Sequence, residues 1–282
     1  MILDAHQHVW TLARGDYGWL TPELAGLYRD FDLADYALAA PFVDASILVQ
    51  AAPSDAETEF LLSLAEGSDR VAGVVGWVDL VSAATPRQLA DLARRPKFLG
   101  VRPMLQDLAD ADWIARDDLT PALEALVGLG LAFDALVRRP NLGGLVRMAA
   151  RHPALRIVID HAAKPDIAGG GFDGWAEALA PFAELPQVVC KLSGLPSEAG
   201  PDWNAKTLAR WIERLMQMFG PERLMWGSDW PVLTEVASLT AWYQAAREVV
   251  EPMGEAALAD VFGGAARRFY HLQQGAMGWV RG

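Results

Sequence analysis

Short apolar runs rich in β-branched residues recur along the whole chain, and each has the length of a buried strand. Stretches with apolar residues three or four positions apart separate them. The clearest such stretch runs from Leu208 to Phe219 and ends at Gly220-Pro221, and another runs from Leu119 to Val127 with Pro121 near its first turn. The spacing predicts helices there. The predicted strands are residues 2–3, 45–49, 71–75, 98–101, 131–133, 155–159, 188–190 and 224–226.

Eight predicted strands that alternate with helices favour a parallel sheet of the α/β class. Eight such units in 282 residues, with no linker between them, favour closure into one (β/α)8 TIM barrel domain that covers residues 1–282. A doubly wound open sheet is the alternative. No Gly-x-Gly-x-x-Gly motif follows an early strand, so the usual nucleotide-binding reason for that fold is missing.

Composition and charge narrow the possible partners. The net charge is −12 and the chain has no run of Lys and Arg, which excludes a nucleic acid as the expected partner. The single cysteine, Cys190, excludes an internal disulfide framework and lies in an apolar run as a buried thiol would. We expect a cytoplasmic protein that binds a small molecule, because there is neither a leader pattern nor an apolar run of about 20 residues. The sequence carries no signal for an oligomeric state.

Polar side chains follow the predicted strands at the ends where they leave the sheet. Asp4, His6 and His8 alternate along the first strand, which predicts that they line one face. The other strands lead into Arg102, Asp134, Asp160-His161, Lys191 with Ser193, and Asp229. In a barrel the carboxyl ends of the strands form the catalytic face, so six strands that carry such groups together predict an active site.

Individual residues suggest individual roles. Asp229, between Gly227 and Pro231, lies at a sharp turn and is the best candidate for a general base. His161 at a strand end is a second candidate for catalysis, and Arg102 could hold a ligand by its forked guanidinium group. Lys191 and Asp134 are candidates for a mutual ion pair.

Three segments are longer than a connection requires and carry aromatic side chains: residues 11–40, 106–118 and 195–206. All three follow strands, so in a barrel they cover the catalytic face. We interpret them as loops over the substrate. Aromatic walls suit the apolar faces of a sugar ring. The predicted wall residues are Trp10, Trp19, Trp113, Trp203 and Trp230.

The motifs together resemble the amidohydrolase superfamily, and within it the sugar-lactonase branch that includes the L-fuconolactonases and L-rhamnono-lactonases. The resemblance extends from residue 3 to residue 270. It rests on Asp4-Ala5-His6-Gln7-His8-Val9-Trp10, Gly100-Val101-Arg102, Asp160-His161-Ala162-Ala163-Lys164-Pro165, Lys191-Leu192-Ser193-Gly194-Leu195, Gly227-Ser228-Asp229-Trp230-Pro231 and Ala265-Ala266-Arg267-Arg268-Phe269-Tyr270.

The resemblance implies a distorted (β/α)8 barrel of the amidohydrolase type and hydrolysis of an ester within a ring. It assigns catalysis to His6, His8, His161 and Asp229, and we expect Arg102, Lys191 and the tryptophans to contact substrate. Arg102 lies where two-metal relatives carry a carboxylated lysine, so a two-metal centre is not expected. Near the last helix, relatives tend to carry Asn where this chain has Gly264.

We expect that no metal is required, because lactonases of this branch often dispense with one. The alternative is a single divalent metal such as zinc, held by His6, His8, His161 and Asp229.

The predicted activity is hydrolysis of an aldono-1,4- or 1,5-lactone to the open-chain sugar acid in carbohydrate catabolism, with Asp229 as general base on water. Two alternatives stay open. One is a metal-dependent hydrolase or decarboxylase that acts on an aromatic or other carboxylic acid, and the other is a non-catalytic barrel that binds a sugar acid. One sequence does not identify the sugar or the ring size.

Overall fold

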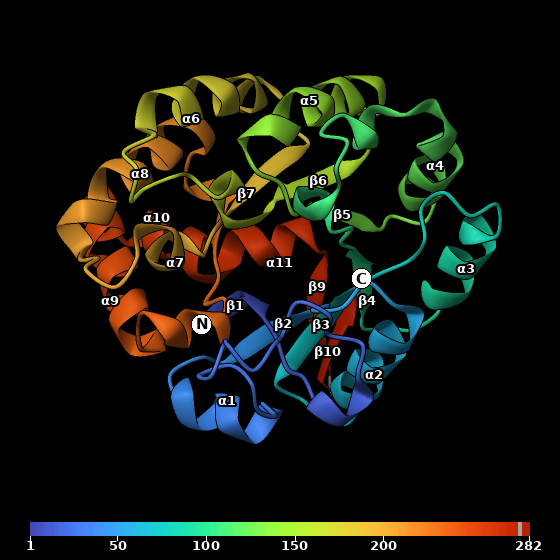
Figure 1. Cartoon of the computed structure of the whole chain (residues 1–282), viewed down its shortest axis with the longest axis horizontal. Helices are drawn as coiled ribbons and strands as arrows, with labels where there is room; N and C mark the ends of the chain where they lie inside the picture. The colour runs from blue at the N-terminus through green and yellow to red at the C-terminus, as the bar shows by residue number, and fades with distance from the viewer. Residues whose placement is uncertain (276–277) are drawn as a thin grey trace.

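The computed structural model describes residues 1–275 and 278–282. At its centre is an eight-stranded sheet in which neighbouring strands are parallel and follow one another in chain order. Helices surround the strands (Figure 1), which confirms the predicted (β/α)8 barrel. The strands are β1 (Leu3–Gln7), β2 (Ala45–Val49), β3 (Val71–Gly76), β4 (Phe98–Val101), β5 (Ala132–Ala135), β6 (Arg156–Ile159), β7 (Val188–Leu192) and β8 (Leu224–Trp226).

The helices pack their apolar faces onto the outside of the sheet and share one continuous core with it. The helix α8 runs over Ala205–Phe219, as predicted, and Gly220 ends it with φ 67°. Among the described residues, no helix is both long and apolar enough to cross a membrane. The other helices are α1 (Leu33–Ala39), α2 (Asp55–Glu66), α3 (Thr85–Leu92), α4 (Thr120–Gly128), α5 (Leu142–Arg151), α6 (Phe172–Leu179), α7 (Leu195–Ala199), α9 (Leu239–Val250), α10 (Glu255–Ala259) and α11 (Ala265–Phe269).

The barrel closes between β1 and β8 through the segments that leave these strands. Gln7 and Trp230 form a parallel bridge there. The His8 N–H donates to the Trp230 carbonyl oxygen (2.7 Å), and the Asp229 N–H donates to the His6 carbonyl oxygen (2.8 Å). These bonds bring the two ends of the sheet together at the carboxyl ends of the strands.

A second apolar cluster fills the barrel, with residues from all eight strands and from the C-terminal segment. That segment contains α11 and the antiparallel hairpin β9 (Leu272–Gly275) and β10 (Gly278–Arg281). The Arg281 N–H donates to the Pro96 carbonyl just before β4, and its Nη1 donates to the Leu129 carbonyl just before β5. The hairpin therefore covers the amino ends of the strands and leaves the carboxyl ends as the open face.

Candidate active site

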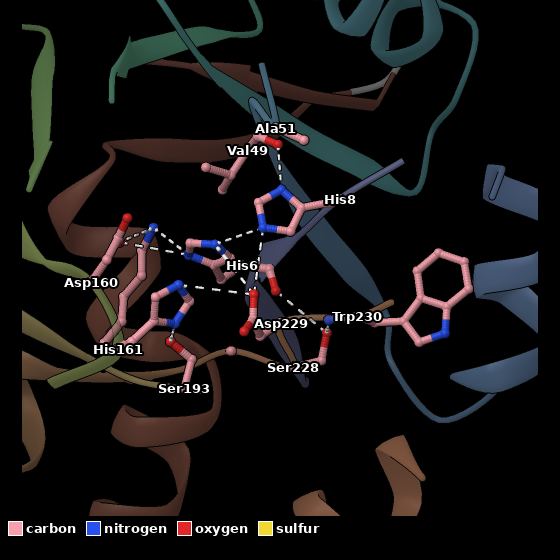
Figure 2. A network of polar contacts seen from close by, with 12 residues as sticks. His6, His8, Val49, Ala51, Asp160, His161, Ser193, Ser228, Asp229 and Trp230 are labelled. Carbon is pink, nitrogen blue, oxygen red and sulfur yellow. Dashed lines mark hydrogen bonds and ion pairs between the residues drawn. The ribbon is translucent and has the colours of Figure 1, made fainter. Parts of the chain in front are cut away.

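Three imidazoles converge on one carboxylate at the carboxyl ends of β1, β6 and β8 (Figure 2). The Nε2 atoms of His6, His8 and His161 lie 3.8, 3.4 and 3.8 Å from Oδ1 of Asp229. The Nε2 atoms of His6 and His8 are 3.1 Å apart. All four side chains are nearly or fully buried. We call this group the histidine–aspartate cluster.

Asp4, predicted to share a face with His6 and His8, lies outside this cluster. The pairing of β1 with β2 is irregular between Asp4 and Gln7, so the simple alternation of faces fails there. The Asp4 carboxylate instead accepts hydrogen bonds from the Ser228 N–H (2.8 Å) and the Tyr36 hydroxyl (2.7 Å). Its place is therefore structural, at the closure of the barrel.

The outer ring nitrogens of the cluster are held in place. Nδ1 of His8 donates to the Val49 carbonyl oxygen (2.8 Å), and Nδ1 of His161 lies 2.9 Å from the Ser193 hydroxyl. Because a carbonyl oxygen only accepts, a neutral His8 carries its proton on Nδ1 and turns an Nε2 lone pair toward Asp229. Two acceptors therefore face each other across 3.4 Å.

Unusual backbone conformations aim these side chains. Residues 161–164 all adopt left-handed φ values between 49° and 60°, and Asp229 has φ 59°. Such conformations are uncommon for residues other than glycine and concentrate at functional sites. Glycines make room beside them: a Cβ on Gly227 would lie 2.7 Å from Cβ of His6, and one on Gly194 would lie 2.9 Å from Cβ of His161. These contacts explain the glycines in the Gly-Ser-Asp-Trp-Pro and Lys-Leu-Ser-Gly-Leu motifs.

Burial sets the protonation states of the cluster. It lowers the pKa of His6 and His8 and lowers that of His161 to about 4, which keeps the imidazoles neutral at pH 7. Burial alone would raise the pKa of Asp229, but in acid the imidazoles of His161 and His8 are protonated before the carboxylate, and their positive charge holds the pKa of Asp229 below its usual value. The result is one buried carboxylate among neutral nitrogen ligands.

This donor set fits a divalent metal. Tetrahedral zinc with bonds of about 2.0–2.1 Å separates its ligand atoms by roughly 3.4 Å, close to the separations between the imidazoles and Asp229. The potential ligand atoms of His6, His161 and Asp229 all lie within 4.8 Å of one another. A cation would also resolve the acceptor-to-acceptor contact of His8 with Asp229.

A cavity of about 290 Å³, the catalytic pocket, opens above the cluster. Arg102, which the sequence predicts to bind substrate, lines it, and its Nη1 lies 3.4 Å from Nε2 of His6. Lys164 also lines the pocket, and burial lowers its pKa. Lys164 is not among the predicted binding residues, although it belongs to the Asp-His-x-x-Lys-Pro motif. The described lining residues are His8, Trp19, Ala51, Arg102, Met104, Gln106, Asp107, Leu136, His161, Lys164, Asp229 and Val232.

Lys191 lies beneath the cluster and lines no part of the pocket. It is fully buried, with Nζ 2.5 Å from Asp134 Oδ2, 3.0 Å from Asp160 Oδ1 and 3.2 Å from Nδ1 of His6. The Tyr270 hydroxyl donates to the same Asp134 oxygen (2.7 Å). We call Lys191, Asp134, Asp160 and Tyr270 the buried ion cluster. Asp134 and Asp160 both contact the ammonium group of Lys191, which explains why Lys191 does not reach the catalytic pocket.

Of the five predicted wall tryptophans, Trp203 lines neither the catalytic pocket nor the cavity next to it, and the other four separate into two groups. Trp10 and Trp230 are buried, with Trp10 donating to the Arg29 carbonyl (2.8 Å) and both rings packed edge-on against Phe31. Trp19 lines the catalytic pocket, and together with Trp113 it also lines a neighbouring cavity. Apolar loop residues next to a strand can pack inward or outward, and the sequence pattern does not distinguish the two.

The chain is similar to known proteins over almost its full length. The chain is 45% identical over 278 residues to an L-fucono-1,5-lactonase of Burkholderia ambifaria, with 96% of each chain covered. It is 36% identical over 294 residues to an L-fucono-1,5-lactonase of Burkholderia multivorans, with 97% of each chain covered. The relationship therefore extends over the whole barrel and not only its motifs.

A solved structure corrects the prediction about the cofactor. The crystal structure of an amidohydrolase from Burkholderia multivorans with bound zinc superposes with a TM-score of 0.91 and 35% identity, covering 97% of this chain and all of the other. Together with the convergent ligand atoms of His6, His161 and Asp229, this finding overturns the expectation that no metal is required. The amidohydrolase family profile matches residues 3–272, and the chain belongs to that family.

Proposed function

We propose that this protein hydrolyses a sugar lactone, L-fucono-1,5-lactone or a close analogue, to the open-chain sugar acid of carbohydrate catabolism. The observation that carries the proposal is the 45% identity to an L-fucono-1,5-lactonase over 96% of both chains. The geometry supports it, since the imidazoles of His8 and His161, the Asp229 carboxylate and the cationic side chains of Arg102 and Lys164 all line one pocket of about 290 Å³.

The proposed reaction begins with a water molecule that attacks the lactone carbonyl carbon. Oδ1 of Asp229 faces the histidines, which leaves Oδ2 to accept the proton from this water. The carbonyl oxygen gains negative charge as the new C–O bond forms. Arg102 and Lys164, which both line the pocket, can stabilise that charge and orient the ring.

Collapse of the tetrahedral intermediate breaks the bond between the acyl carbon and the ring oxygen. Asp229 then returns its proton to the departing ring oxygen, and the product is a hydroxy acid whose carboxyl group ionises in water. The convergent ligand atoms of His6, His161 and Asp229 would hold a divalent metal, which would lower the pKa of the attacking water. Trp19 in the pocket wall offers an apolar face to the sugar ring.

The test is acid release from a panel of aldono-1,4- and 1,5-lactones, followed with a pH indicator and corrected for spontaneous opening. Protein treated with a chelator is compared with the same protein after zinc is restored. We expect the highest kcat/KM for L-fucono-1,5-lactone, a loss of at least about 10²-fold on chelation, and recovery with zinc. Silence of the zinc-loaded protein across the panel would overturn the proposal and favour an aromatic or other carboxylic acid as substrate.

A further inference from the structure

A second cavity of about 570 Å³ adjoins the catalytic pocket on the open face of the barrel. It lies among the segments that follow β1, β2, β3 and β4. Trp19, Met104 and Asp107 line both cavities, so the two spaces are neighbours across a shared wall. The remaining described lining residues are Asp16, Gly18, Pro53, Trp77, Val78, Asp79, Leu80, Pro103, Leu108 and Trp113.

The walls of this second cavity are apolar. Three indoles, those of Trp19, Trp77 and Trp113, face it together with Leu80 and Leu108. Trp19 and Leu108 are each 38% exposed, although both are large apolar side chains. Exposed apolar surface that gathers in a concave site is typical of ligand binding.

One wall of the second cavity is held in place by hydrogen bonding, and the charges along its lining favour a neutral ligand over an anionic one. The Trp19 indole donates to the Ala51 carbonyl oxygen (2.7 Å) and packs edge-on against Trp10, which fixes the shared wall. The charged residues among the described lining are the carboxylates of Asp16, Asp79 and Asp107, and that lining includes no Lys or Arg; Arg14, outside it, pairs with Asp16 (2.7 Å), which leaves Asp79 and Asp107 as the carboxylates that set the charge of the rim. Such a rim disfavours an anionic group and accepts a neutral one.

We propose that this cavity is an apolar subsite, which receives an uncharged alkyl or aryl substituent on the lactone ring while the ring occupies the catalytic pocket. The inference rests on the proposed function and specifies its substrate class: lactones with an apolar side chain next to the ring oxygen. The two cavities border each other at Trp19 and Met104, which favours one ligand whose ring lies in the first and whose substituent reaches the second.

The test uses 1,5-lactones that carry no substituent at C5 or an unbranched alkyl chain of one, three, five or seven carbons. For the zinc-loaded protein we expect kcat/KM to rise about threefold to fourfold for each methylene, until the subsite is filled. Leu108→Asp places a charge in the subsite and should flatten this dependence. Leu38→Asp is the matched control, because Leu38 is 84% exposed on α1 and lines neither cavity.

The outcomes separate the two proposals. Turnover of unsubstituted and sugar lactones without any dependence on chain length would overturn the subsite and leave the lactonase proposal standing. No turnover of any lactone would overturn the lactonase proposal. A chain-length dependence that Leu108→Asp leaves unchanged would place the substituent outside this cavity and overturn the proposal. If Leu108→Asp instead dissociates an oligomer, as measured by sedimentation, the second cavity belongs to an interface between copies of the chain.

Discussion

Two polar clusters lie one above the other in the barrel, and they are built on opposite principles. In the histidine–aspartate cluster, three neutral imidazoles gather around one carboxylate beside a cavity, and His8 and Asp229 present acceptor atoms to each other. In the buried ion cluster, Lys191 lies 2.5 Å from Asp134 and 3.0 Å from Asp160, and all three side chains are fully buried. The upper cluster borders the catalytic pocket, whereas the lower one pairs its own charges, and we infer that the upper serves a ligand and the lower serves the fold.

The sharpest test of this division is Asp229→Asn. The amide cannot accept the proton from water, and we expect kcat to fall about 10²–10⁴-fold with the folded structure intact. Loss of lactone hydrolysis with an unchanged melting temperature would support the assignment of this cluster to catalysis and not to stability. Asp173→Asn, at an exposed position on α6 that lines neither cavity, is the control and should retain most activity. Activity retained by the Asp229 variant would refute its role as base.

Lys191→Met should reverse that pattern. Removing the ammonium group leaves the carboxylates of Asp134 and Asp160 buried without their shared partner, and breaking a buried pair in this way costs about 3–5 kcal/mol of unfolding free energy. Urea unfolding of the variant beside Lys206→Met, at an exposed site on α8, measures the effect. A variant as stable as the parent would show that the lower cluster does not support the fold.

Glu57 is a buried carboxylate outside both clusters. Unlike Asp134 and Asp160 it does not contact Lys191, and its contribution to the stability of the fold depends on pH. Burial raises the pKa of Glu57 from 4.5 to about 7, against hydrogen bonds from Tyr17 and Ala51. Its protonated form is favoured in the folded state, so this stabilisation is complete below pH 4.5 and is lost as the pH rises through about 7.

Glu57→Gln keeps this side chain neutral at every pH. We expect the unfolding free energy of the parent to fall by about 3 kcal/mol between pH 4.5 and 7 relative to the variant, because one pKa unit corresponds to about 1.4 kcal/mol. Urea unfolding across this range measures it. Glu177→Gln, at an exposed position on α6, should follow the parent, and parallel curves for parent and Glu57→Gln would contradict the prediction.

The smallest effect is expected from Tyr270→Phe. The variant removes only the hydroxyl that donates to Asp134 Oδ2 (2.7 Å), while Lys191 still neutralises that carboxylate. We expect a loss of about 1–2 kcal/mol in unfolding free energy and little change in kcat. A large loss of activity with unchanged stability would show that the lower cluster acts on catalysis.

The sequence pattern predicted those features that depend on local periodicity. Residues 45–49, 98–101 and 224–226 form strands with the predicted bounds, because apolar runs of that length are buried on both faces of a parallel sheet. His6, His8, His161 and Asp229 also gather at the strand ends, as barrel topology requires.

The sequence pattern did not predict features that depend on long-range packing. Trp230 and Trp19 both follow strands, yet one is buried against Phe31 and the other lines a cavity. The hairpin at the amino ends of the strands was not predicted either, since β9 exposes Gln273 and Gln274 and lacks apolar alternation. Such placements depend on which distant segments arrive beside them.

The closure of the barrel has a consequence for how the protein assembles. His6 and His8 come from the first strand and its exit, and Asp229 follows the last strand of the barrel, more than two hundred positions along the chain. These side chains meet only across the seam where β1 and β8 join. Any ion or molecule that binds all of them therefore holds that seam closed. Its binding free energy contributes to the stability of the folded barrel.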